Sequence, residues 1–384
     1  MRDFVITSES VTVGHPDKLC DQISDAVVDA YLAAGRRDGV IAECAIASGV
    51  VFLSVRAGSG AGAEPPADLA GLARRVLADA AGPGAAETGD EAPAVILEMA
   101  TLPEAATHRA GAHPWRMVTA FGYACDQSAT AMPVPVALSH RIARGLDQAR
   151  DAGRLAWMSP DAQVQVAARY ADRRLAALAA VSLTCGTLQP VTQDHARQQF
   201  VADILTPALA EFGLDAGAVP QVSVFPSEGP AGLTRHSGLT GRKSADDAYG
   251  SFARRGGPAL SGKDPSRADR ISAYAAREAA RALVEAGLAA EAEVQLSYVG
   301  GDEAPASIEV DSFGSGRLAD ATLSARLREA VDFRIGAIAE RMRLWELPGE
   351  RGGRFYRDLA TYGHMGRDDL ETPWDVSTLA GRLG

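Results

Sequence analysis

Short apolar segments alternate with amphipathic helical segments in three successive blocks of the chain, and this alternation constrains the fold more than any other sequence feature. The 384 residues exceed what one hydrophobic core usually organises, which favours two or three domains. Each block holds a few strands and two helices over roughly 110–140 residues, within the usual domain range. We therefore predict an α+β protein of three similar domains, at 1–100, 113–228 and 229–375, and consider parallel Rossmann winding the weaker interpretation.

Hydrophobic periodicity places the elements within these blocks. We expect helices at 21–32, 69–81, 136–148, 194–212, 270–289 and 320–333, and strands at 4–6, 42–55 (a hairpin turning at Ser48-Gly49), 94–99, 162–170, 177–183, 221–225, 292–298 and 307–310. The polar residues 8–14 are expected to form a loop. Residues 99–115 show no clear periodicity and are a candidate lid or linker.

Composition argues against several classes of protein. The formal net charge of −11 argues against nucleic acid or an anionic membrane as the main partner. The N-terminal residues lack the layout of a signal peptide, and the longest apolar stretch, 40–55, is too short to span a bilayer. The four cysteines are scattered, without metal-binding spacing or a disulfide framework. We therefore expect reduced thiols, no membrane partner and a cytoplasmic location.

Three glycine-flanked loops combine cations with carboxylates. The segment 261–270 carries Lys263 and Arg267 beside Asp264 and Asp269, behind a Gly-Gly-Pro hinge. Residues 14–18 combine an imidazole, a carboxylate and an ammonium, and residues 238–243 end on two adjacent cations. Lysine and arginine neutralise phosphate oxygens, and aspartate is a ligand that Mg²⁺ prefers. The loops together predict a site for a magnesium–nucleotide complex.

An ordered set of motifs covers nearly the whole chain. It consists of Thr7-Ser-Glu-Ser-Val with Gly14-His-Pro-Asp-Lys18, Met132-Pro-Val-Pro with Ser139-His-Arg, Gly238-Leu-Thr-Gly-Arg-Lys243, Ser261-Gly-Lys-Asp-Pro-Ser and Thr361-Tyr-Gly-His-Met-Gly-Arg367. In this set the chain resembles the S-adenosylmethionine synthetases (methionine adenosyltransferases), as a divergent member. The resemblance implies three α/β-sandwich domains in a pseudo-threefold arrangement, and a homodimer or homotetramer with active sites at the dimer interface.

The resemblance also implies a reaction. The sulfur of L-methionine attacks C5′ of ATP, triphosphate leaves and is hydrolysed to phosphate and diphosphate, and Mg²⁺ and K⁺ are required. A thioether needs no general base, so alignment and charge stabilisation of the leaving group carry the catalysis.

Individual roles follow from the matched motif positions. His15, Arg242, Lys243 and Lys263 are expected to contact the phosphates as the catalytic set. Asp161, Gln163 and Arg267 are expected to complete the ATP site. The resemblance assigns Asp17 and Asp269, from different domains or subunits, to Mg²⁺, and Glu43 to K⁺.

The amino-acid half of the site departs from the family pattern. Arg56, Arg116 and His236 stand where the family has acids, Arg267 replaces one lysine and Gln163 another. An arginine about 4 Å from the methionine ammonium would repel it by roughly 4 kcal/mol at an effective dielectric constant near 20. Three alternatives to methionine adenosyltransfer therefore stay open: a more anionic acceptor, a nucleotide-binding regulatory homologue with little turnover, and a triphosphatase without an acceptor. A misplaced gap near Arg116, or substitution by Glu98 or Asp126, would instead preserve methionine binding.

Overall fold

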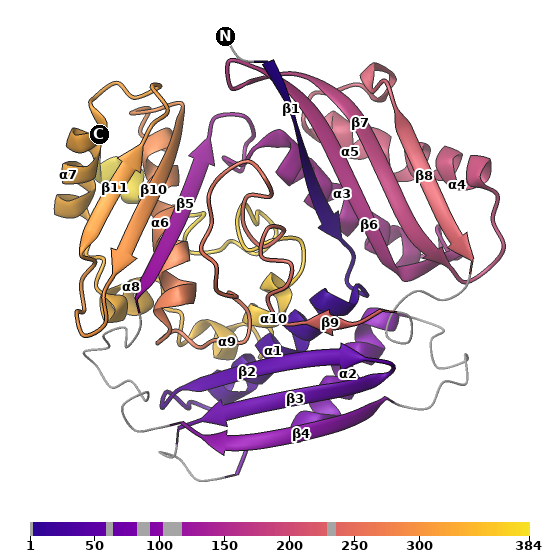
Figure 1. Ribbon diagram of the computed structural model, residues 1–384, viewed down its shortest axis with the longest axis horizontal. Coiled ribbons are helices and arrows are strands. Elements are labelled where there is room, and N and C mark those ends of the chain that lie inside the picture. Colours follow the sequence, from indigo (N-terminus) through magenta and orange to yellow (C-terminus); the bar gives the residue numbers. More distant parts are fainter. Residues whose placement is uncertain (1–2, 59–63, 83–92, 103–116, 229–235) are drawn as a thin grey trace.

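The computed structural model contains three separate β-sheets around helices (Figure 1). It describes residues 3–58, 64–82, 93–102, 117–228 and 236–384. One sheet has the order β4-β3-β2-β9, from strands Ala94–Thr101, Val50–Ala57, Val40–Ala47 and Gly238–Leu239. A second has the order β1-β6-β7-β8, from Asp3–Val11, Met158–Ala171, Arg174–Thr187 and Val222–Glu228. The third has the order β11-β10-β5, from Ser307–Asp311, Glu291–Tyr298 and Val118–Cys125. The α+β class predicted from the sequence is confirmed.

A common pattern of pairing relates the sheets. Each contains an antiparallel hairpin (β2–β3, β6–β7 or β10–β11), and the first strand of each hairpin also pairs antiparallel with a strand from another block. β1 pairs with β6, β5 with β10 and β9 with β2. Each sequence block therefore gives its first strand to the sheet of another block, in a closed cycle. Each sheet combines strands from both sides of a predicted domain boundary, near 100–113 or 228–229. The division into three contiguous domains therefore stays a prediction.

Helices of equal length pack against the same position in each sheet. α1 (Pro16–Ala33), α3 (Val134–Asp151) and α6 (Ala268–Glu285) have 18 residues each. Each packs on the first strand of its hairpin and on the strand received from another block. A second helical segment covers each sheet: α2 (Leu69–Ala81), the run α4 (Gln193–Gln199), η3 (Phe200–Leu205) and α5 (Thr206–Glu211), and α7 (Asp320–Ala330). The short helices α8 (Ile335–Arg341), α9 (Leu347–Glu350) and α10 (Phe355–Leu359) follow near the C-terminus.

Two boundaries near the N-terminus differ from the prediction. The predicted loop at 8–14 is wrong for residues 8–11, because β1 continues to Val11 and buries Ser8 and Ser10 against the central block. α1 begins at Pro16 rather than Asp21, with the His15 ring accepting the Asp17 N–H as a cap and proline in the first turn. The first turn of α1 contains charged residues, so hydrophobic periodicity does not reveal where the helix begins. The structure does not describe most of the candidate lid, residues 103–116.

No helix in the described part of the chain is both long and apolar enough to cross a membrane. All four cysteines are buried and free.

Gly122 permits the closest approach between β5 and α6. A Cβ atom at Gly122 would lie 1.9 Å from the backbone carbon of Ala276 and 2.0 Å from its oxygen. Backbone atoms of a packed helix cannot move aside as a flexible side chain can. We expect Gly122→Ala to lower the free energy of unfolding by about 2 kcal/mol or more, measured from urea unfolding. Gly336→Ala in α8, where the new Cβ meets nothing within 4 Å, is the control and should be neutral or stabilising. Equal unfolding curves for the two variants would contradict this account.

Candidate active site

The loop before α1 and the start of β6 are hydrogen-bonded together. Gly14 N–H donates to Pro160 O (3.1 Å), and a Cβ on Gly14 would lie 2.6 Å from Pro160 atoms. The Thr12 hydroxyl donates to Pro160 O (2.7 Å) and accepts from Ala162 N–H (2.7 Å). These contacts bring the segment that carries Asp161 close to the helix start that carries His15 and Asp17.

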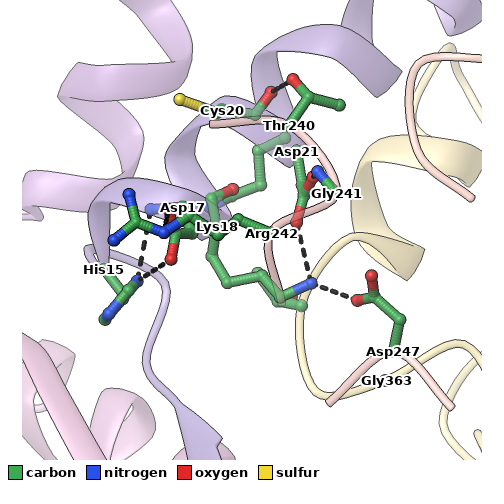
Figure 2. A network of polar contacts seen from close by, with 12 residues as sticks. His15, Asp17, Lys18, Cys20, Asp21, Thr240, Gly241, Arg242, Asp247 and Gly363 are labelled. Carbon is green, nitrogen blue, oxygen red and sulfur yellow. Dashed lines mark hydrogen bonds and ion pairs between the residues drawn. The ribbon is translucent and has the colours of Figure 1, made fainter. Parts of the chain in front are cut away.

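The loop 238–243 attaches to the same helix start. Asp17 Oδ1 accepts the Leu239 N–H (3.1 Å), and Asp21 Oδ1 accepts the Gly241 N–H (2.7 Å). The guanidinium of Arg242 approaches Asp17 Oδ1 at 3.7 Å and remains about half exposed. Figure 2 shows Arg242 beside Asp17 at the N-terminal end of α1. A Cβ at Gly238 would lie 2.2 Å from Pro16 O, so the loop needs glycine there.

Lys18 anchors this loop and does not face a ligand. Its side chain is 1% exposed, and its ammonium pairs with Asp21 (3.0 Å) and with Asp247 (Figure 2). Its two carboxylate partners offset the burial penalty and raise the pKa of Lys18 above its ordinary value. The ammonium that the sequence analysis counted in the 14–18 loop is therefore structural.

Glu9 bridges two of the predicted nucleotide residues. One carboxylate oxygen of Glu9 lies 3.2 Å from Lys243 Nζ, and the other accepts from Gln163 Nε2 at 2.7 Å. Glu9 belongs to the Thr7-Ser-Glu-Ser-Val motif, but no role was predicted for it from the sequence.

The charges that act on His15 and Asp161 indicate that both lie near His236 and Lys243. Burial, followed by repulsion from Lys243, lowers the pKa of His15 to about 3, and His236 and Arg242 contribute. Burial raises the pKa of Asp161 to about 6, while His236 and Lys243 oppose the shift. We call this set of residues the phosphate clamp: Glu9, His15, Asp17, Asp161, Gln163, His236, Arg242 and Lys243.

The loop around Lys263 lies elsewhere on β2. The Ala42 N–H donates to Gly262 O (2.8 Å), and Lys263 pairs with Ile41 as an isolated bridge. Gly262 has φ of +78°, and a Cβ there would meet Ala42 O at 2.0 Å. Lys263 Nζ pairs with Asp269 Oδ2 at 2.9 Å, and both side chains are partly exposed.

Two other charged residues of this loop point inward. Asp264 is fully buried and accepts the Val40 and Ser266 N–H groups at 2.5 and 2.7 Å. Arg267 is 6% exposed, with Nε 3.9 Å from Asp264 Oδ2. Asp264 therefore secures the loop.

Glu43 and Arg56 accompany Lys263 on the outer face of the sheet. Arg56 is exposed and lies opposite Ile41, which in turn lies opposite Lys263. Residues directly opposite each other on paired strands lie on the same face of a sheet, and so do residues two apart on one strand. The exposed Glu43, two residues from Ile41, therefore lies on this face as well. We call this set the outer-face group: Glu43, Arg56, Lys263 and Asp269.

The phosphate clamp and the outer-face group are spaced apart along one strand. Leu239 pairs with Ala45 and Lys263 with Ile41, and four residues of β-strand span about 13 Å. The structure therefore brings most of the described site residues into two groups, and buried Arg267 belongs to neither. Arg116 lies outside the described residues.

The donor atoms suit Mg²⁺ only in combination with a ligand. No three His, Cys, Asp or Glu side chains within the described ranges are grouped to hold a metal ion. Mg²⁺ is commonly bound through one or two carboxylates together with substrate phosphates. Asp17 in the phosphate clamp and Asp269 in the outer-face group each offer one carboxylate, which fits that pattern.

Comparison with known proteins gives a consistent result along the whole chain. Family models described as the N-terminal, central and C-terminal domains of S-adenosylmethionine synthetase match residues 3–83, 116–226 and 230–376. The chain is 40% identical to the S-adenosylmethionine synthase of Prochlorococcus marinus (strain MIT 9313), with 100% of this chain and 97% of the relative covered. It is 39% identical to that of Synechococcus sp. (strain RCC307), with 100% of both chains covered.

Asp246 is a buried carboxyl that the sequence analysis missed. It is 2% exposed, and neither of its oxygens accepts a hydrogen bond from the described residues. Burial raises its pKa to about 7, although Lys243 and Lys18 attract the charged form. Since the unfolded carboxyl titrates near 4, the folded protein binds the extra proton between pH about 4 and 7, and stability falls as pH rises through that window.

Asp246→Asn should therefore increase the urea midpoint more at about pH 8 than at about pH 5, because the amide carries no charge to bury. Asp302→Asn on the exposed 299–306 segment is the matched control, with no difference expected between the two pH values. A gain for Asp246→Asn that is equal at both pH values would refute the assignment.

Proposed function

The chain belongs to the S-adenosylmethionine synthetase family and is a methionine adenosyltransferase, and from this premise we propose how its own residues carry the transfer. The comparisons do not favour a more anionic acceptor or a regulatory homologue with little turnover. The single observation that supports the residue roles is the phosphate clamp at the start of α1. It gathers two exposed or partly exposed cations and a neutral imidazole around one helix N-terminus.

His15 acts as a hydrogen-bond donor to the departing triphosphate. Its Nδ1 accepts the Asp17 N–H at 3.2 Å, which requires that nitrogen to be unprotonated. With the His15 pKa near 3, the ring is neutral around pH 7 and carries its proton on Nε2. An Nε2–H aimed at the oxygen that leaves C5′ stabilises developing negative charge without a proton transfer.

Lys243 and Arg242 supply positive charge to the same triphosphate. Lys243 contacts Glu9, and Arg242 contacts Asp17. Arg242 is about half exposed and the Lys243–Glu9 pair is partly exposed, so phosphate oxygens can reach both cations, whereas Asp17 itself is buried. Asp161, Gln163 and Arg267 complete the ATP site, with Arg267 acting from its buried position beside Asp264.

Mg²⁺ and K⁺ are general requirements of the family. We assign Mg²⁺ to Asp17 and Asp269, where it would neutralise phosphate charge, and K⁺ to Glu43.

The acceptor pocket is the second part of the proposed site. We assign it four residues: Arg56, Arg116, His236 and Arg267. On the face that carries Arg56, Glu98 accepts the Ser54 hydroxyl (2.6 Å) and offers a carboxylate to the methionine ammonium. Asp126 is a weaker candidate because it is paired with Arg174 at 2.9 Å.

Each active site is completed by a second subunit. The phosphate clamp and the outer-face group are about 13 Å apart along β2, and Lys263 is held by Asp269 rather than by the phosphate clamp. A homodimer, alone or within a tetramer, would pair the phosphate clamp of one subunit with the outer-face group of the other.

Lysine reactivity provides a direct test of nucleotide binding. The chain contains three lysines, Lys18, Lys243 and Lys263. We expect Mg²⁺ and a non-hydrolysable ATP analogue to slow acetylation of Lys243 and Lys263 at least about tenfold, because phosphate contact ties up both ammonium groups. Peptide mass spectrometry measures the labelling. Buried Lys18 should stay unlabelled with or without nucleotide, as an internal control. Unchanged labelling of Lys243 would show that the phosphate clamp does not bind the nucleotide phosphates.

The activity test uses ATP, L-methionine, Mg²⁺ and K⁺. Lys243→Met should lower kcat/KM for S-adenosylmethionine formation by about 10²–10³, the usual loss for one stabilising contact to a leaving group. Asp269→Asn should lower Mg²⁺-dependent turnover by a similar factor. Product analysis by mass spectrometry separates adenosyl transfer from triphosphate cleavage alone. Arg255→Met, an exposed cation outside both groups, is the control and should leave kcat/KM unchanged. Full activity of Lys243→Met would overturn its role.

Subunit complementation tests the shared site. Lys243→Met and Lys263→Met are each expected to be nearly inactive. In a mixed population, half of the dimers are hybrids, and one of the two sites in each hybrid holds both native lysines. Co-refolding should therefore restore about a quarter of the wild-type activity. Mixing without co-refolding is the control. No recovery from verified hybrids would show that both lysines serve the same site from one chain.

A further inference from the structure

A second pocket lies between α3, α5 and the segment 362–368, and none of its lining residues belongs to the phosphate clamp or the outer-face group. Its walls combine apolar, basic and acidic side chains: Met132, Phe212 and Met365, then His140, Arg141 and Arg144, and the carboxylates Glu211 and Asp368. Part of the lining comes from the motifs at 132–135, 139–141 and 361–367, to which the adenosyl-transfer site assigns no role.

His140 presents an unsatisfied polar atom. The residue is 8% exposed, and its Nδ1 lies 2.8 Å from the Ser10 hydroxyl. Its Nε2 makes no hydrogen bond of good geometry to the described residues, although the Asp246 carbonyl lies close enough to raise its pKa slightly against the larger effect of burial. Burial lowers the pKa of His140 to about 3, so the ring is neutral near pH 7. A buried polar atom of this kind is unfavourable unless a ligand or a water molecule satisfies it.

The two arginines of α3 pair with carboxylates, two of which are exposed. Arg141 Nε donates to both oxygens of Glu211, at 2.9 and 2.7 Å. Arg144 lies 2.9 Å from Asp369 and 3.5 Å from Asp368. The side chains of Glu211 and Asp368 are 50% and 66% exposed, so their ion pairs are screened by solvent, whereas Asp369 is less exposed and also pairs with Arg367 at 2.8 Å. Arginine binds carboxylate and phosphate groups in a bidentate geometry, and an incoming anion can replace either partner.

Hydrogen bonds connect the pocket to the phosphate clamp. His140 contacts Ser10, which is adjacent to Glu9 on β1. The Tyr362 hydroxyl donates to Asp147 Oδ2 (2.8 Å), which also accepts the Val13 N–H (3.0 Å). Both connections end on the segment 9–15, which carries clamp residues.

We propose that this pocket is a second binding site, for a small organic anion with an apolar body. Arg141 and Arg144 bind the anionic group, the His140 Nε2 atom contacts one polar atom of the ligand, and Met132, Phe212 and Met365 contact its apolar part. The site is separate from the nucleotide site and does not depend on the roles assigned there.

Calorimetry with phenyl phosphate tests the site, with benzyl alcohol as the uncharged probe. We expect saturable binding of phenyl phosphate to the wild-type protein and to Lys243→Met, whose phosphate clamp is impaired. The double variant Arg141→Gln/Arg144→Gln should bind at least about tenfold more weakly, because both anion contacts are removed. The matched control Arg154→Gln/Arg351→Gln removes two exposed arginines elsewhere and should bind as the wild type does.

Three results would overturn the proposal. The first is no saturable binding of phenyl phosphate up to about 10 mM, an affinity too weak for a built site. The second is equal binding by the Arg141→Gln/Arg144→Gln variant or equally tight binding of benzyl alcohol. The third is loss of binding in Lys243→Met, which would place the probe in the phosphate clamp instead.

Discussion

Backbone hydrogen bonds along one edge of β2 hold both cationic loops in place. Residues 238–240 bond to β2 at residues 44–46, and residues 262–264 bond at residues 40–42. Glycines at 238 and 262 allow the loop backbones to approach where a Cβ would collide. The ends of two distant segments are thus aligned by an ordinary strand edge, and the reactive cations project from a rigid support. The same alignment also separates them, which is why a single chain offers two incomplete groups.

Buried charge secures this support. Lys18 lies between Asp21 and Asp247, and Arg270 makes a bidentate pair with Asp25 at 2.7 and 2.9 Å. Removing one partner of such a pair leaves an uncompensated charge in the interior and destabilises by roughly 3–5 kcal/mol. These pairs connect α1 to the loop that follows β9 and to the first turn of α6, so they specify one arrangement of the site. The three lysines differ in burial. Lys18 is buried and anchors the loop that follows β9, whereas Lys243 and Lys263 are partly exposed.

Sequence patterns predicted most of the elements, but not the division of the predicted site residues into two groups. The hairpin at Ser48-Gly49 and the helix at 69–81 follow from local periodicity and turn chemistry, and both are confirmed. The polar second half of β1 could not be predicted, because Ser8 and Ser10 are buried only through pairing with a strand more than 150 residues away. Motif likeness identified His15, Lys243 and Lys263 without showing which of them share a neighbourhood. Glu9 and Asp246 escaped notice because their significance comes from tertiary neighbours rather than from spacing.

The cyclic exchange of first strands has a consequence for synthesis on the ribosome. When residues 1–100 have emerged, β2 still lacks the partner that residues 238–239 will provide, and β1 has no sheet to join. The nascent polypeptide must therefore carry an unpaired edge until more than half of it has been translated. Exposed edges of this kind invite pairing with neighbouring chains. Chaperone demand and yield during overexpression should depend on how quickly the third segment arrives.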